Sequence, residues 1–193
     1  MSDKDITVSD SSFGGDLTGR DKIDNRSLNI NTIYERSAYL QELYEKFEEE
    51  KKTNPGLQEL CDDLDYFNSR IEDEEIQGLD AKLIAGNREK ILKHATRWKE
   101  KFHMKLIKTS QYSKVAQDIN VHILTKVERS FMMDVYTMIC NDESEETINA
   151  LIDEKIIKPV MADLGINLFK YDEGDVMGMI FFLTGNCHIK WTP

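Results

Sequence analysis

Apolar residues recur at intervals of three and four residues through most of the chain, and this periodicity limits the fold more than any other feature. Each such stripe lies on one face of a helix, so that the helix buries that face against its neighbours. Asn54 and Pro55 have the residue types of a helix start, and Gly78 ends the run that follows. The stripes cover residues 40–47, 57–71, 91–106 and 112–138. Long amphipathic helices joined by short turns predict an up-and-down helical bundle.

The segment after residue 140 predicts a smaller end to this bundle. Ser144 is a good N-cap for a further helix, which Pro159 kinks or ends. Near the C-terminus, Asp175 is expected to cap a last helix and Gly185 to stop it in a left-handed conformation. Residues 188–191 would then leave as a short extended piece. The predicted fold is therefore mainly α, a helical bundle with a small α+β C-terminal end.

Residues 1–32 differ from the rest because they are polar and glycine-containing, with too few apolar residues for a core of their own. We expect an extended N-terminal arm followed by one helical domain over residues 33–193. Two hypotheses fit the arm: it is a disordered tail, or copies from several chains stack through the turn-forming pairs Gly15-Asp16 and Gly19-Arg20. The second hypothesis would make the arm an oligomerisation segment.

Charge is distributed unevenly along the chain. The net charge of -11 argues against a general nucleic-acid binder, because neutralising phosphates dominates such binding. Residues 42–80 nevertheless have an excess of ten negative charges, and residues 82–108 an excess of seven positive ones. We expect helices from these two segments to face each other. The alternative is a nucleic-acid-binding face formed by Lys90, Lys93, Arg97, Lys101, Lys105 and Lys108.

Catalytic and metal-binding motifs are not recognisable. The glycines form neither a P-loop nor a dinucleotide-binding fingerprint, and the histidines and cysteines lack the short spacings of metal ligands. We therefore expect no enzyme, no metal and no cofactor. The alternative is a hydrolase in which Cys187 is the nucleophile and the fold supplies His94, His103 or His122 as its base.

The apolar runs are short. The longest, residues 176–183, spans eight residues, whereas a membrane helix needs about 20. No basic and apolar leader opens the sequence, and Cys61, Cys140 and Cys187 are odd in number and widely spaced. We expect a cytoplasmic protein with free thiols and no membrane partner.

The C-terminal third carries a resemblance to a known family. The string GMIFFLTGNCHIKW, preceded by ALIDEKIIKPVMADLG, resembles the C-terminal module of third components in prokaryotic ABC-ATPase three-component conflict systems, the Lamassu-like anti-phage class. The resemblance extends over about residues 33–193. It implies an SMC-like ABC ATPase and a middle component as partners, with only indirect or weak contact to nucleic acid. Effectors of this class usually place a toxic domain before the module, and 193 residues leave no room for one. We therefore expect a non-enzymatic subunit or adaptor.

The resemblance also places the docking surface in the C-terminal segment, where aromatic residues are dense. Phe181 and Trp191 are the expected anchors, with Lys190 at the polar rim, since one helix face cannot bury every aromatic there. Asn186 and Gly185 would fix the turn that aims the final strand. The N-terminal string FGGDLTGRDKIDN is similar to short segments that precede effector or signalling domains in prokaryotic immune proteins.

Overall fold

The structure is a computed structural model that describes residues 38–53, 62–71, 75–111 and 113–193. The chain divides into two units, residues 1–33 and 34–193, and everything below concerns the second unit. The N-terminal arm, its oligomerisation hypothesis, Cys61 and the expected helix start at Asn54-Pro55 lie outside the described residues.

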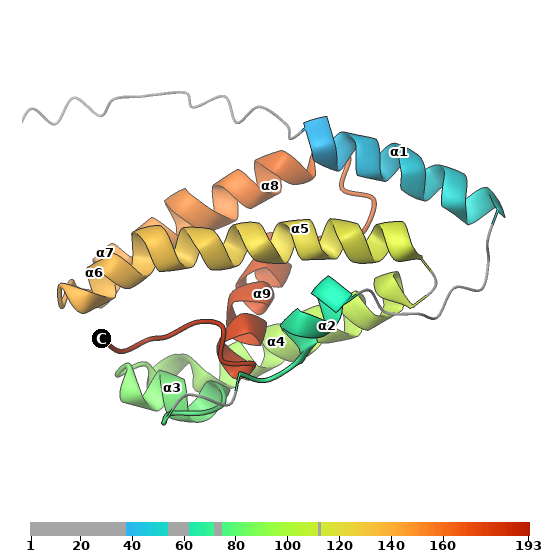
Figure 1. Ribbon diagram of the computed structural model, residues 1–193. Coiled ribbons are helices and arrows are strands. Elements are labelled where there is room, and N and C mark those ends of the chain that lie inside the picture. Colours follow the sequence, from blue (N-terminus) through green and yellow to red (C-terminus); the bar gives the residue numbers. More distant parts are fainter. Residues whose placement is uncertain (1–37, 54–61, 72–74, 112) are drawn as a thin grey trace, which may run out of the picture. The chain divides into compact units, whose positions relative to one another are not determined.

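Helices make up the regular structure of the described residues, and they are joined by short turns (Figure 1). They are α1 (Ala38–Thr53), α2 (Asp62–Asn68), α3 (Leu79–Ala85), the 3₁₀ turn η1 (Glu89–Ile91), α4 (Leu92–Ser110), α5 (Lys114–Ser130), the π turn η2 (Phe131–Val135), α6 (Tyr136–Cys140), α7 (Glu145–Ile152), the π turn η3 (Asp153–Ile157), α8 (Lys158–Leu164) and α9 (Glu173–Gly185). The predicted mainly-α bundle is confirmed.

The predicted α+β end is wrong, because no strand occurs in the part of the chain that the structure describes. Residues 188–193 instead lie as an irregular tail against α3. The buried Lys82 donates a hydrogen bond of 2.9 Å to the carbonyl of Ile189, which a strand ladder would otherwise have satisfied. The tail is therefore held by side chains and has no neighbouring strand to pair with.

Helix α9 is the centre of the bundle and passes between α4 and α5 (Figure 1). Its sequence is apolar on all sides, which is typical of a helix surrounded by protein. Ten of its residues are buried, and the closest approach is to α4. At Gly178 an added Cβ would lie 2.4 Å from the carbonyl oxygen of Trp98. Only glycine allows the two helix backbones to come this near.

Helix α1 packs on α5 through the first predicted stripe. Leu40, Leu43, Tyr44 and Phe47 are all buried, and the last two make edge-to-face contacts with Phe169. This position removes α1 from α4, so the acidic residues of α1 do not face the basic helix. The described part of the acidic segment still meets α4 through α2, where Asp65 and Lys99 line one groove. Burial of its apolar stripe determines where α1 packs.

Two long helices contain π turns. The predicted stripe over residues 112–138 becomes α5, η2 and α6 without a break, and α7, η3 and α8 are likewise continuous. Pro159 lies in the first turn of α8, directly after η3, and the helix continues to Leu164. The proline therefore accompanies a local distortion and does not end the helix.

Both ends of α9 differ from the prediction. Asp172, and not Asp175, is the N-cap, and the two form a capping box in which each side chain accepts a backbone N–H of the other. Gly185 is helical, and the left-handed residue is Cys187, with φ of 67°. The helix therefore begins three residues earlier than expected. The left-handed residue that follows it lies two positions after Gly185, the last glycine of the helix.

Candidate functional site

The two aromatic residues expected to anchor a partner lie inside the fold. Phe181 is 0% exposed and Trp191 4%. Phe181 stacks on Trp98 with ring centroids 6.0 Å apart and on Trp191 at 6.3 Å, while Phe131 meets Trp191 edge-on at 5.0 Å. The rings of Phe181 and Trp191 are therefore covered by other aromatic side chains of the same chain. A partner could reach the two side chains only if the tail detached, so we assign them to packing.

A hydrogen bond, a cation–π contact and close packing at Trp191 hold the tail against the rest of the fold. Its indole N–H donates to the hydroxyl of Thr184 at 3.0 Å, and the guanidinium of the buried Arg88 lies 4.9 Å from its ring centroid. An added Cβ at Gly86 would lie 2.7 Å from the Cβ of Trp191. Burial lowers the pKa of Arg88, and Glu145 at 3.8 Å partly offsets this effect.

The other three predicted docking residues have separate positions. Lys190 is exposed on the tail. Asn186 donates to the carbonyl of Phe67 at 2.8 Å and accepts the N–H of Ile71 at 3.2 Å, so its turn holds the α2 segment and does not aim a strand. An added Cβ at Gly185 would lie 3.2 Å from Cε of Lys99, which places Gly185 beneath α4. The five predicted residues do not form one exposed surface.

The basic row of α4 is divided in two. Lys101 pairs with Asp172 at 2.7 Å and with the fully buried Asp175 at 3.1 Å, and Lys105 also pairs with Asp175. The hydrogen bond from Lys101 holds the pKa of Asp172 below its usual value. These two lysines therefore secure the start of α9.

The remaining cations on and before α4 face outward. Lys90, Lys93, Arg97 and Lys108 are exposed and form no ion pair with any described residue. They are the part of the predicted nucleic-acid-binding face that has no ion-pair partner in the described ranges of the chain.

Two large apolar side chains lie on the same outward face of α4. Met104 is 67% exposed and Ile107 is 53% exposed, and their spacing of three residues places them side by side on the helix. Both fall outside the buried stripe of α4. An apolar residue off the stripe of an amphipathic helix is the sequence signal that could have identified them.

An apolar groove begins beside Ile107. It has a volume of about 460 Å³ and runs between α2 and α4. Leu64, Leu106 and Phe182 are among its lining residues but are each at most 2% exposed, so Ile107 is the large exposed apolar side chain of the lining. His103 also lines the groove, with its ring 5.5 Å from that of Phe182. Burial, and then the nearby Lys99, lower the pKa of His103, so the neutral ring is favoured. We call Met104, Ile107 and this groove the α4 surface.

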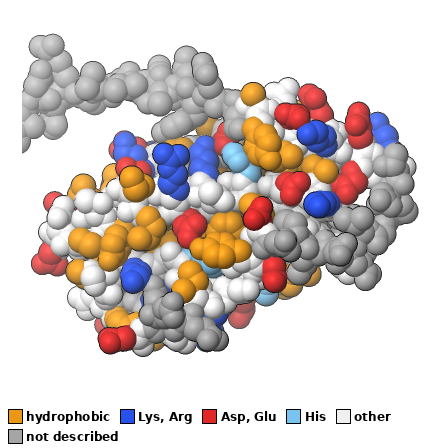
Figure 2. Space-filling model, in the orientation of Figure 1, with side chains coloured by type: hydrophobic (Ala, Val, Ile, Leu, Met, Phe, Trp, Pro, Cys, Tyr) orange, Lys and Arg blue, Asp and Glu red, His pale blue; other side chains and the backbone are white. Residues whose placement is uncertain are grey.

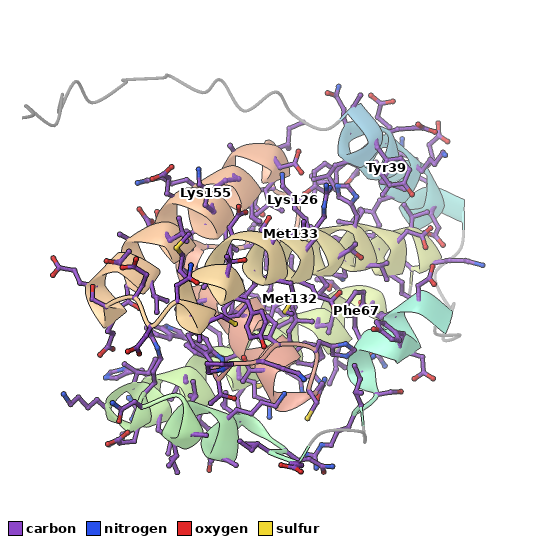
Figure 3. All side chains as sticks on the ribbon, turned by 60° about the vertical axis from the view of Figure 1, so that its left-hand side comes forward. Tyr39, Phe67, Lys126, Met132, Met133 and Lys155 are labelled. Atoms are coloured by element: carbon purple, nitrogen blue, oxygen red, sulfur yellow. The ribbon has the colours of Figure 1, made fainter. Side chains whose placement is uncertain are left out.

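A second hollow, of about 610 Å³, lies on the other side of α5. There Asp163 accepts from Lys126 at 2.9 Å and lies 3.7 Å from Nε2 of His122, whose pKa is lowered by burial despite that carboxylate. Figure 2 shows basic side chains gathered where α5 and α8 lie, and Figure 3 shows Lys126 on α5 with Met133 further along the same continuous helix. Two cationic side chains, Lys126 and Arg129, and two carboxylates, Asp134 and Asp163, line the hollow, so its lining favours neither sign of ligand.

The cysteine hydrolase alternative gains no geometric support. Cys187 is 2% exposed, and within the described residues it makes no side-chain hydrogen bond with His94, His103 or His122. The searched residues also contain no group of three or more His, Cys, Asp or Glu that could hold a metal ion. No described helix is both long and apolar enough to cross a membrane.

The fold is a small helical module whose C-terminal tail packs back against α3. The α4 surface exposes apolar and basic side chains on one helix face. Comparison with known families specifies the class further. A family model, the C-terminal domain 9 of the ABC-three component (ABC-3C) systems, matches residues 78–191. Because this match covers more than half of the chain, the protein belongs to that family. Searches of curated proteins and of solved structures give no match.

The matched range agrees with the structure at both ends. It begins at Gly78, the N-cap of α3, and ends at Trp191, which closes the core on α3. Helices α1 and α2 precede it, so the α2 wall of the groove is outside the matched range. The sequence resemblance to an ABC-ATPase three-component module is confirmed.

Proposed function

We propose that this chain is a non-enzymatic adaptor subunit of an ABC-3C system, acting in the cytoplasm in anti-phage defence. It docks through the α4 surface onto the system's SMC-like ABC ATPase or its middle component. The observation that carries this proposal is the exposed pair Met104 and Ile107 beside an apolar groove, on a module of the ABC-3C family. Large exposed apolar side chains beside a concave apolar surface are typical of protein interfaces.

Co-expression tests the docking. We expect the double variant Met104→Glu/Ile107→Glu to lose capture of the co-expressed ABC ATPase and middle component, because two carboxylates would have to be desolvated in the interface. The matched control is Met133→Glu/Ile84→Glu, since these residues are 69% and 57% exposed on other elements. Capture that survives the first variant, or that is lost equally in the control, would contradict docking through α4.

The non-enzymatic part is tested separately with purified protein. Plasmid DNA, RNA, nucleoside triphosphates and casein, each with Mg²⁺ or Mn²⁺, should remain unchanged, because we expect no enzymatic activity from this chain. Turnover that disappears in Cys187→Ala would revive the hydrolase alternative.

A further inference from the structure

The charge around the α4 surface is opposite to that of the whole protein. Lys93, Arg97, Lys99 and Lys108 lie on α4 around Met104 and Ile107. Among the described residues, the carboxylates on the same surface are Glu100 of α4 and Asp65 of α2, both exposed. Four cations against two anions make this a locally basic surface on a chain with a net charge of -11. A complementary partner segment would therefore be acidic.

The groove walls indicate the conformation of such a segment. Adding a strand requires an exposed sheet edge, and the described residues contain no strand. The groove instead lies between two helices, and Met104 and Ile107 form a ridge spaced three residues apart. A ridge of this spacing fits between the side chains of another helix. The groove has a volume of about 460 Å³, which is within the range of ordinary ligand sites, roughly 300–1,000 Å³.

We infer that the partner element entering the α4 surface is an acidic amphipathic helix. Its apolar face packs against the exposed Met104 and Ile107 along the groove, and its carboxylates pair with Lys93, Arg97 and Lys108. This inference rests on the proposed docking function and specifies the chemistry of the partner.

Nucleic acid fits the same surface less well. A phosphate backbone would meet the cations but leave Met104, Ile107 and the groove without an apolar partner. Two of the six predicted phosphate contacts, Lys101 and Lys105, are also held by Asp172 and Asp175. Duplex DNA therefore serves as the competing ligand in the test.

The test uses fluorescent peptides and the full chain. The probe is a designed helix of about 18 residues, roughly 27 Å long, which matches the 19 residues of α4. It has leucine at helical spacing on one face and glutamate elsewhere, and its control has lysine in place of every glutamate. We expect the acidic peptide to bind, the basic peptide to bind at least about tenfold more weakly, and added salt to weaken binding.

Variants locate the binding. Lys93→Glu/Arg97→Glu/Lys108→Glu should weaken binding of the acidic peptide at least about tenfold. Lys52→Glu/Arg129→Glu/Lys170→Glu, at exposed lysines and arginine elsewhere, should leave it unchanged. Thermal unfolding of each variant, matched to that of the parent, verifies that the fold is intact. Equal loss in both triple variants would overturn the inference.

The remaining outcomes separate this inference from the proposed function. If Met104→Glu/Ile107→Glu abolishes capture of the ABC ATPase but the acidic peptide does not bind, docking stands and the acidic helix is overturned. If the peptide binds as expected but capture is unaffected, the inference holds for the surface and the proposed function fails. Tight DNA binding with a steep salt dependence, lost in the α4 triple variant, would overturn the inference in favour of nucleic acid.

Discussion

Helix α9 with its tail and the outward face of α4 make opposite use of large apolar residues. Phe181 and Trp191 are buried, and their rings meet those of Trp98 and Phe131. Met104 and Ile107 are more than half exposed and lie beside a groove. The first region therefore contributes mainly to the free energy of folding, and the second is available for a partner.

In this chain, aromatic density in the sequence does not identify an exposed surface. The sequence around residues 181–191 has more aromatics than one helix face can bury, but α9 is enclosed on several sides and buries them all. An exposed apolar residue is informative when it lies off the buried stripe of its own helix.

Removing the indole of Trp191 should cost the most stability. Trp191→Ala deletes the stacking on Phe181, the hydrogen bond to Thr184 and the contact with Arg88. We expect a loss of about 3–5 kcal/mol in the free energy of unfolding, measured by urea denaturation. Lys190→Ala, at the exposed neighbour, should change it by under about 0.5 kcal/mol. A small loss in Trp191→Ala would show that the tail is not part of the core.

A methyl group at Gly178 should force α4 and α9 apart. Gly178→Ala places a Cβ 2.4 Å from the backbone oxygen of Trp98, and overpacking of this kind costs about 1–3 kcal/mol. Gly185→Ala on the same helix meets only the flexible end of Lys99 and should be nearly neutral. Thermal unfolding of the two variants measures the difference. Similar melting temperatures would contradict the close approach of the two helices.

Loss of the cap on α9 should cost about 1 kcal/mol. Asp172→Ala removes the acceptor for the N–H of Asp175 and the partner of Lys101, whereas Glu173→Ala removes a carboxylate from the same turn without a capping bond. The lowered pKa of Asp172 means that its stabilisation is present above its ordinary value of 3.8 and is lost as pH falls through the folded value. Denaturation at neutral and acidic pH should show this difference, and equal effects of the two variants would contradict the cap.

Acid should also weaken the contact between α2 and the tail through His188. This side chain is 0% exposed, lies 3.7 Å from Glu128 and packs against the rings of Tyr66 and Phe67. Burial lowers the pKa of His188, and the positive charge of Lys82 acts in the same direction. The unfolded chain therefore binds the proton first, and stability falls as pH decreases below about 6.5. His188→Phe should flatten this part of the pH profile, and an unchanged profile would contradict the assignment.

The sequence predicts the helices better than their ends or their neighbours. The stripes that contain Leu43, Phe102 and Ile123 occur as predicted, because burying apolar residues at helical spacing is a local requirement. The cap at Asp172 was missed because Asp175 fits the same pattern and only the folded backbone distinguishes N-cap from N3. The π turns have no counterpart in the periodicity.

The site was harder to predict for a physical reason. Burial of Phe181 and Trp191 depends on α3, α4 and η2 converging from distant parts of the chain. Likewise, the carboxylates that engage Lys101 and Lys105 come from about 70 residues further along, and not from the acidic segment next in sequence. The exposure of Met104 can be predicted from the sequence, since the pattern of α4 alone places this residue outside the buried stripe.

The most direct test of these separate roles measures stability and association together in two variants. Trp191→Ala and Met104→Glu/Ile107→Glu are compared by thermal unfolding and by binding to the co-purified ABC ATPase and middle component, at a temperature where both variants are folded. We predict that Trp191→Ala lowers the melting temperature and retains binding, while the α4 variant melts like the parent and loses binding by at least about thirtyfold, or roughly 2 kcal/mol. Lost binding in folded Trp191→Ala, with binding retained in the α4 variant, would show that the tail, and not the outward face of α4, contacts the partner.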